Sequence, residues 1–298
     1  EIRLSLVGSE MCIRDRSPHR FELHAGALRL AVRPDLGGSI AGLWHRDLPV
    51  MRSTDPPQLE SARQSACYPL VPYSNRIAYR RFRWRGRDYT TEANFDDNPH
   101  SVHGVGWQRP WTVVATGSND LGLRLSHSGD AHWPFAFEAE QYFALEPDAL
   151  TVRLVITNTD ERPQPVGLGW HPYFPTRSRS RLHVELSDRW ESDATQLPTR
   201  RVPQPGIDGD VSHLGFDHCF DGWKGAARIR DERLSLSLTS SLDRLVVYTP
   251  SDKPYFCVEP VSHVSNAIHM SDPIAHGLRE LEAGARTEAW MRLTVAVV

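Results

Sequence analysis

Alternation between apolar and polar residues recurs along almost the whole chain and constrains its fold more than any other feature. In residues 150–156 (LTVRLVI) every even-numbered position is apolar, and a period of two is typical of a strand with one buried face. Turns rich in Gly, Pro, Asn and Asp separate further runs of this kind, which cover residues 28–32, 81–89, 111–115, 121–125, 137–145, 182–186, 234–238, 245–248 and 293–297. Helical periodicity is scarce, and residues 273–282 could form one or two helical turns. The pattern predicts an all-β protein, either a sandwich or a barrel.

The same pattern indicates how the 298 residues are divided. No Pro/Gly/Ser-rich linker and no repeat of fixed period interrupts the succession of strands, so residues 18–298 are expected to form a single domain. Residues 1–17 (EIRLSLVGSEMCIRDRS) do not join the pattern. We expect them to be a non-native or disordered extension.

Composition narrows the classes of partner. The chain has 34 Lys and Arg against 37 Asp and Glu, a formal net charge of -3, so there is no general electrostatic reason to expect nucleic acid or an anionic membrane. No apolar run reaches membrane-spanning length. The four cysteines are far apart and form no C-x-x-C pair, which favours a reducing, cytoplasmic setting over a zinc cage or disulfide framework.

The stretch Gly169-Trp170-His171-Pro172-Tyr173-Phe174 holds a histidine between a tryptophan and a proline. Pro172 cannot donate to a strand ladder and biases His171 toward an extended backbone. His171 is therefore expected at a strand end among aromatic rings. Two interpretations remain open, a tuned acid or base and a core histidine bonded to a carbonyl.

Four further stretches depart from alternation and combine polar with aromatic residues. They are residues 67–77 (CYPLVPYSNRI), 100–111 (HSVHGVGWQRPW), 216–220 (FDHCF) and 256–266 (FCVEPVSHVSN). The prolines of the first forbid a central strand, yet the segment is too apolar for a loose loop. We expect it to be a packed segment that delivers Asn75 and Arg76.

Glu259 follows the apolar run 255–258 and precedes a proline. A carboxylate beside a buried strand end loses solvation, so its pKa should rise above the usual value of about 4.3. Such a carboxylate and an imidazole that titrates near neutrality make a matched base and acid. Glu259 could instead form a structural ion pair, with Arg76 as a possible partner.

The aromatic residues that flank these polar groups could stack on the apolar face of a pyranose or could simply be core. They are Trp107, Trp111, Trp170, Tyr173 and Phe220. Histidines are plentiful, but no H-E-x-x-H or comparable spacing occurs, so no functional metal is expected. The chain also lacks a G-x-G-x-x-G after a strand, a Walker loop and a G-x-S-x-G elbow, which leaves nucleotide cofactors and serine hydrolase chemistry unsupported.

Taken in order, the segments YPLVPYSNRI, VHGVGWQRPW, GWHPYF, FDHCF and VEPVSHVSNA resemble those of the aldose 1-epimerase family, also called galactose mutarotases. With the strand pattern on both sides, the resemblance covers the chain from Phe21 on. It implies a large antiparallel β-sandwich of the galactose mutarotase-like type. It also implies a monosaccharide substrate, no cofactor, and a monomer or homodimer.

The resemblance also implies roles for particular residues. His171 matches the general acid that protonates the ring oxygen, and Glu259 matches the general base that takes the proton of the anomeric hydroxyl. His103 matches a second histidine that positions the sugar. Arg76 and Asp217 match residues that bond the sugar hydroxyls. Beyond the resemblance, Asn75 and Trp170 are also expected to contact the substrate.

One departure leaves the sugar open. Val105 follows His103-Gly104, where many galactose-active members carry a second glycine. Arginines such as Arg80, Arg81 and Arg109 keep a phosphorylated hexose as an alternative substrate. The chain could also be a glycoside hydrolase, with Glu259 and Asp217 about 5–9.5 Å apart, or a non-catalytic carbohydrate-binding protein.

Overall fold

The structure is a computed structural model that describes residues 20–298. The extension expected at residues 1–17 lies outside these residues. No α-helix occurs among residues 20–298, and the all-β prediction is confirmed. No helix forms in residues 273–282, where the sequence allows helical turns. A non-helical turn ends at Gly277 (φ 92°), and strand β26 follows. The short 3₁₀ helices are η1 (Pro56–Gln58), η2 (Ala62–Gln64), η3 (Ala78–Arg80), η4 (Gly106–Gln108), η5 (Val211–His213) and η6 (Ala267–His269).

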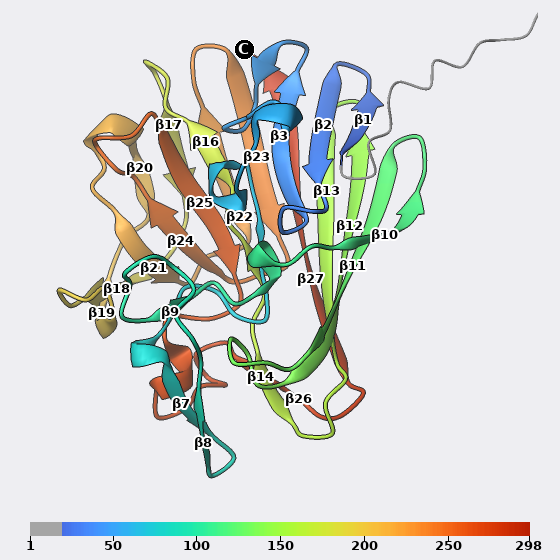
Figure 1. Ribbon diagram of the computed structural model, residues 1–298. Coiled ribbons are helices and arrows are strands. Elements are labelled where there is room, and N and C mark those ends of the chain that lie inside the picture. The colour runs from blue at the N-terminus through green and yellow to red at the C-terminus, as the bar shows by residue number, and fades with distance from the viewer. Residues whose placement is uncertain (1–19) are drawn as a thin grey trace, which may run out of the picture.

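Nine antiparallel strands form the larger sheet of a β-sandwich (Figure 1). In spatial order they are β10 (Thr112–Thr116), β11 (Asp120–Ser128), β12 (Ala136–Glu146), β13 (Ala149–Asn158), β27 (Arg286–Val297), β23 (Leu234–Ser240), β22 (Ala226–Arg230), β17 (Arg181–Val184) and β20 (Ile207–Asp210). The register places Val152 of β13 between Phe143 and Met291 of its neighbours. Three buried side chains thus meet on one face of the sheet.

Eight strands form the second sheet, which carries the segments singled out in the sequence. Seven of them follow the spatial order β19 (Pro198–Pro203), β18 (Asp188–Ser192), β21 (Asp217–Asp221), β24 (Arg244–Tyr248), β25 (Tyr255–Val261), β15 (Gly169–Trp170) and β5 (Pro69–Leu70). The eighth, β16 (Tyr173–Pro175), also pairs with β25. β5 contains Pro69 and lies at the end of this order, where a residue without an N–H interrupts the fewest ladder bonds.

Smaller sheets complete the architecture. One has four strands, β1 (Phe21–Ala25), β2 (Leu28–Arg33), β3 (Ser39–His45) and β4 (Leu48–Pro49). Three are pairs: β14 (Gln164–Val166) with β26 (Arg279–Leu281), β6 (Arg76–Ile77) with β9 (Ser101–Val102), and β7 (Arg81–Trp84) with β8 (Arg87–Thr90). The β7–β8 hairpin projects at the bottom of Figure 1, and its turn residues Arg85 and Gly86 both have positive φ, as a tight two-residue hairpin turn requires.

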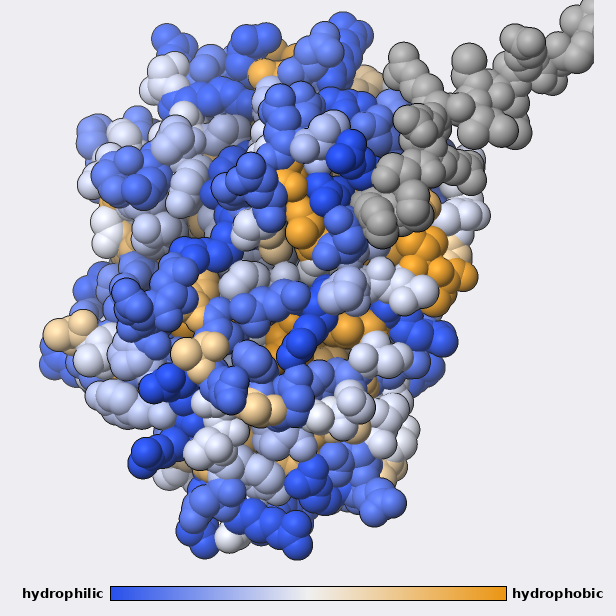
Figure 2. Space-filling view, in the orientation of Figure 1, coloured by the Kyte–Doolittle hydropathy of each residue, from blue (hydrophilic) through white to orange (hydrophobic). Residues whose placement is uncertain are grey.

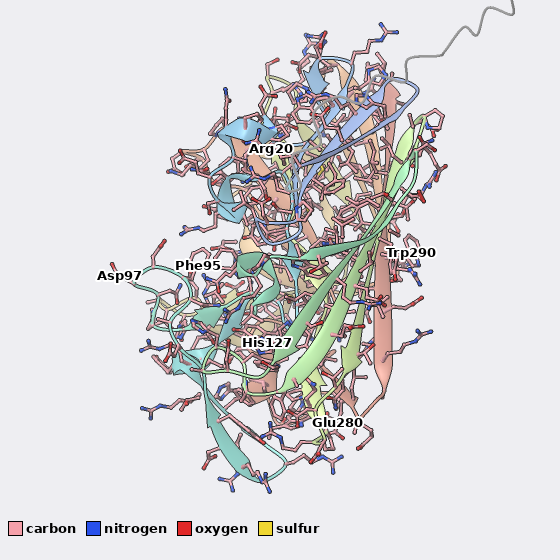
Figure 3. The ribbon with its side chains drawn as sticks, turned by 45° about the vertical axis from the view of Figure 1, so that its right-hand side comes forward. Arg20, Phe95, Asp97, His127, Glu280 and Trp290 are labelled. Carbon is pink, nitrogen blue, oxygen red and sulfur yellow. The ribbon has the colours of Figure 1, made fainter. Side chains whose placement is uncertain are left out.

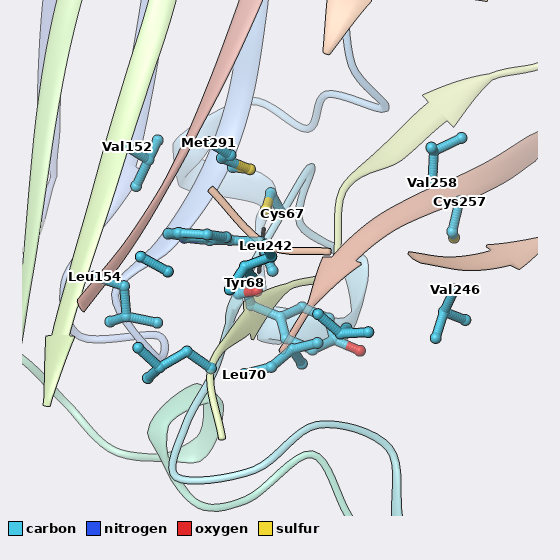
Figure 4. Close-up of a cluster of buried hydrophobic side chains, with 14 of the residues drawn as sticks. Cys67, Tyr68, Leu70, Val152, Leu154, Leu242, Val246, Cys257, Val258 and Met291 are labelled. Carbon is cyan, nitrogen blue, oxygen red and sulfur yellow. Dashed lines mark hydrogen bonds between the residues drawn. The ribbon is translucent and has the colours of Figure 1, made fainter. Parts of the chain in front are cut away.

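The apolar positions of the alternating runs form the core. The even-numbered residues from Leu150 to Ile156 are all buried, and the core continues from Leu23 to Val295. Figure 4 shows part of it, where Tyr68 and Leu70 of the proline-containing segment join side chains of β13 and β27. That segment is packed, as expected, so the residues after it start from a fixed backbone.

The outer surfaces follow the opposite half of the pattern. Trp290 of β27 is 41% exposed and lies on the outer side of the large sheet (Figure 3). The face in Figure 2 is mainly hydrophilic, with apolar residues in separate areas. Within residues 20–298 no helix has the length and apolar character needed to cross a membrane.

Candidate active site

His171 lies between β15 and β16, where the chain changes its pairing along β25. Its backbone N–H donates to the Tyr68 carbonyl over 3.0 Å. Its imidazole stacks on the ring of Tyr173, with centroids 4.5 Å apart and planes at 17°, and also contacts the ring of Tyr68 at 4.8 Å. Backbone and rings together fix the orientation of an imidazole that is only 8% exposed.

Glu259 lies on β25 and faces this imidazole. Its carboxylate Oε1 is 3.5 Å from His171 Nε2, and the side chain is almost completely buried. On the other side of β25, the register pairs Glu259 with Val246 of β24, so the residue sits inside the sheet and not at a frayed end. Residues 88 positions apart in the sequence thus bring an imidazole and a carboxylate together.

The surroundings oppose charge on both groups. Burial raises the pKa of Glu259 well above 4.5; the nearby Asp217 raises it further, and Arg76 lowers it. Burial, and then the charge of Arg52, lowers the pKa of His171 from 6.5 to about 3. At a pH between the two pKa values the pair holds one proton, and both shifts favour its place on Glu259. An ion pair with Arg76 is the structural role considered for Glu259, but among the described residues the carboxylate lies within ion-pair distance of His171 and not of Arg76.

His103 is the second histidine at this site. It follows β9 with φ 64°, and its backbone N–H donates to the Asn75 carbonyl over 2.8 Å. Its Nδ1 accepts from the Asn75 backbone N–H at 3.0 Å, so in the neutral ring Nε2 carries the proton. Burial and the charges of His171, Arg76 and Arg63 hold the pKa of His103 well below 6.5. Its ring centroid is 5.2 Å from that of His171. His103 therefore offers a fixed N–H donor beside the acid–base pair.

Arg76 enters the site through the β6–β9 pairing, which sets it opposite Val102, one residue before His103. Its Nη1 donates to Asn75 Oδ1 at 2.8 Å, and Ser265 Oγ donates to the same oxygen at 2.9 Å. Asn75 thus orients the guanidinium. Burial lowers the pKa of Arg76, while the charges of Asp217 and Glu259 raise it. The guanidinium therefore lies close to both carboxylates.

Asp217 begins β21 and is exposed. Its Oδ2 accepts from Gln196 Nε2 at 3.1 Å, and the oxygen of the same amide accepts from Arg76 Nη2. The structure therefore brings together His171, Glu259, His103, Arg76, Asn75 and Asp217.

Trp170 differs from the rest of the expected sugar contacts. Its side chain is completely buried, so no part of it is open to a ligand. Successive side chains of an extended segment point to opposite faces. Since His171 faces the site, Trp170 faces the core. The same core environment holds Phe220, and Trp107, Trp111 and Tyr173 are also buried.

Two residues that shape the site are not marked as functional by the sequence. Tyr68, which packs on His171, lies in the first unusual segment, and that position is its only signal. Gln196 lies at an exposed hairpin tip between β18 and β19, with no motif to mark it.

Metal binding has one possible location among the described residues. Ligand atoms of His171, Cys257 and Glu259 lie within 4.8 Å of one another, and all three side chains are buried. Burial and the charge of Glu259 raise the pKa of the Cys257 thiol well above 9.0. A metal would have to displace that proton before the sulfur could bind it, which weakens the site.

The chain is similar in sequence to a known family over almost its whole length. A family model described as aldose 1-epimerase matches residues 19–294. The uncharacterized protein YphB of Escherichia coli K12 is 32% identical, and the match covers 92% of this chain and 98% of YphB.

Solved structures share the fold. A crystal structure of a candidate aldose 1-epimerase from Escherichia coli K12 superposes with a TM-score of 0.85 at 29% identity, covering 94% of this chain and 99% of the solved chain. A galactose 1-epimerase from Lactobacillus acidophilus NCFM has a TM-score of 0.77 at 12% identity, covering 95% of this chain and 96% of the solved chain. At that identity the second likeness speaks for the fold alone.

Proposed function

Because the chain belongs to the aldose 1-epimerase family, we propose that it interconverts the α and β anomers of a free hexose by opening and reclosing the sugar ring. The observation that carries the proposal is the 3.5 Å approach of His171 Nε2 to Glu259 Oε1. An anomeric hydroxyl is a poor acid and a ring oxygen is a poor base. Supplying both proton-transfer partners at once opens the hemiacetal without a charged intermediate.

In the proposed reaction, Glu259 takes the proton of the anomeric hydroxyl while His171 delivers a proton to the ring oxygen. The bond between the anomeric carbon and the ring oxygen breaks, and a free aldehyde forms. Rotation about the adjacent carbon–carbon bond presents the other face, and reclosure with reversed roles gives the other anomer. One proton leaves the sugar and one enters it, so the total charge of the pair does not change. The opposed pKa shifts favour the pair's one proton on Glu259 in the free protein, so the reacting form, with Glu259 ionised and His171 protonated, requires that proton to pass to His171 across their 3.5 Å contact.

Three groups beside the pair are proposed to hold the sugar. The Nε2–H of neutral His103 is a donor for an oxygen near the ring, and Arg76 and Asp217 are a donor and an acceptor for hydroxyl groups. Trp170 is not among the proposed direct contacts, because its ring is completely buried. We infer that it supports the backbone that carries His171.

We propose a neutral hexose because two of the arginines that suggested a phosphate are not placed to bind one. Arg109 is ion-paired with Asp130, so its charge is already compensated. Arg81 lies exposed on β7, in the hairpin that projects away from the large sheets. These two arginines do not favour a phosphate, and a hexose phosphate serves as a comparison substrate. A cytoplasmic location stays a prediction.

Polarimetry of freshly dissolved α-glucose, α-galactose and glucose 6-phosphate tests the proposal. Wild-type protein should accelerate the approach to anomeric equilibrium with at least one free hexose. Glu259→Gln and His171→Asn should each lower the rate by about 10²–10⁴-fold, the usual contribution of a positioned acid or base. The matched controls are Glu60→Gln and His24→Asn, which make the same chemical changes at exposed positions.

Full activity in either site variant, with the fold intact by circular dichroism, would refute the acid–base assignment. Sugar binding without acceleration by the wild type would indicate a carbohydrate-binding protein. Release of the aryl alcohol from an aryl glycoside would indicate a glycoside hydrolase.

A further inference from the structure

The position between Arg76 and Asp217 is already occupied by a side chain of the protein itself. The Gln196 amide oxygen accepts from Arg76 Nη2, and the Gln196 amide nitrogen Nε2 donates to Asp217 Oδ2 at 3.1 Å. A sugar hydroxyl, which is also both donor and acceptor, would make the same pair of bonds. Gln196 therefore satisfies these two groups in the manner expected of the substrate.

The hairpin tip that carries Gln196 is built to present it. Asp193 Oδ1 accepts from the backbone N–H of Thr195 and of Leu197, at 2.8 and 3.1 Å, and the Gln196 N–H donates to the Asp193 carbonyl at 2.9 Å. These bonds hold Gln196 at φ 65°, a region that residues other than glycine rarely adopt. The tip is thus a defined turn and not a loose loop end.

A second contact docks the tip onto the site. His100 Nδ1 accepts from the Tyr79 backbone N–H at 2.9 Å, which leaves the proton on Nε2. That Nε2 lies 3.1 Å from the Thr195 carbonyl and donates to it. His100 belongs to the same segment as His103, so the hairpin is anchored to the element that carries the second histidine.

We propose that Gln196 is a built-in competitor for the hydroxyl-binding position, and that the substrate binds by displacing its amide from Arg76 and Asp217. This inference rests on the proposed function, since it assigns those two residues to the sugar. Gln196 is exposed, so its side chain can swing into water without breaking core packing. Displacement lowers the apparent affinity in proportion to the fraction of molecules in which the position is free. A sugar that can bridge Arg76 and Asp217 recovers that cost, and a sugar without the matching hydroxyl does not.

Removing the amide tests the proposal. In Gln196→Gly the positive φ is retained without strain, and Gln196→Ala is a second variant that also lacks the amide. Thr199→Ala is the matched control, because Thr199 lies in the same hairpin and, among residues 20–298, its hydroxyl bonds only to the Glu191 carbonyl. The readouts are the KM and kcat of mutarotation for the hexose accepted by the wild type, and calorimetric titration with that hexose, or with galactose if no mutarotation is seen.

Both Gln196 variants should bind sugar roughly three- to tenfold more tightly, the range expected when one or two exposed hydrogen bonds no longer compete. Their kcat should stay within about twofold of the wild-type value, since Gln196 does not touch the acid–base pair. Thr199→Ala should leave both quantities unchanged.

Unchanged or weaker sugar binding in the Gln196 variants would overturn the inference and would make Gln196 either irrelevant or a direct sugar contact. Failure of the proposed function has a different signature, namely a wild-type protein that does not accelerate mutarotation. In that case the calorimetric comparison still decides the role of Gln196. Absence of binding in wild type and variants alike would overturn both.

Discussion

The burial that tunes the pKa of Glu259 for catalysis also destabilises the folded protein. The carboxyl group is enclosed in the sheet, with Asp217 nearby, and burial is the first cause of its raised pKa. A pKa raised by folding means that the native state releases its proton at higher pH than the unfolded state does. Above pH 4.5 the unfolded chain gains from ionising Glu259 and the native protein does not. The stability that Glu259 takes away therefore grows as pH rises toward its native pKa.

Glu259→Gln should accordingly stabilise the protein while it lowers activity, and the stabilisation should be larger at high pH than at low pH. The amide keeps the shape of the side chain and cannot ionise, so the pH-dependent penalty disappears. The measurement is the difference in Tm between variant and wild type at pH 5 and pH 8. We expect the difference to increase with pH. A difference that is the same at both values would show that Glu259 ionises as easily in the native protein as in the unfolded chain; the exposed Glu60→Gln should show no trend.

At the scale of elements, the site depends on two irregular segments that dock on each other. Residues 67–77 bring Tyr68, Asn75 and Arg76, and residues 100–111 bring His103. An isolated parallel bridge joins Val71 to Gly104, and the Val71 carbonyl accepts from the N–H groups of Val105 and Gly106. Gly104 has φ 68°, and a Cβ there would lie 2.4 Å from the Val71 oxygen. The glycine thus permits the approach that holds His103 beside His171.

Gly104→Ala should therefore disturb both stability and substrate binding. Backbone atoms must move to relieve the clash, and we expect a loss of about 2–4 kcal/mol in the free energy of unfolding, with a higher KM because His103 shifts. Gly86→Ala is the matched control. Gly86 has φ 78° with open space around it, so it carries only the cost of positive φ, about 1–2 kcal/mol. Urea denaturation and saturation kinetics measure the two effects, and equal behaviour of the two variants would contradict the role given to the Val71–Gly104 contact.

The elements also show what the sequence can and cannot predict. Period two identified the strands because burial of one face is a local property of the chain. The same rule could have excluded Trp170 as a contact, since its neighbour His171 needs the opposite face. The 3.5 Å approach of His171 to Glu259 depends on which strands pair, and neither stretch encodes that by itself. The role of Gln196 could not be predicted for a different reason, because an exposed residue at a hairpin tip belongs to no periodic pattern or motif.

At the scale of the whole molecule, buried histidines connect the site to acid stability. Burial lowers the pKa of His171 to about 3, that of His263 to about 4, and that of His103 well below 6.5. His263 shows why the native protein resists protonation. Its Nε2 accepts from the Ser74 N–H at 3.0 Å while its Nδ1 donates to the Val264 carbonyl at 2.8 Å, so a second proton would break the first bond.

Stability should therefore fall as pH drops below 6.5. In that range the unfolded chain binds protons at these histidines and the native protein does not, so each one removes up to about 1.4 kcal/mol per pH unit until its native pKa is reached. Glu259 has a raised native pKa, so its ionisation makes stability rise as pH falls. The slope of stability against pH for the wild type therefore does not isolate the effect of the histidines. The comparison of His263→Asn with wild type does, since both retain Glu259. The free energy of unfolding in urea should fall less between pH 7 and pH 5 for the variant than for the wild type, although the variant is less stable at pH 7. The two slopes should differ by up to the contribution of one proton, about 1.4 kcal/mol per pH unit. His24→Asn, at an exposed position, should follow the wild-type slope, and an equal slope in His263→Asn would mean that this histidine does not couple folding to protonation.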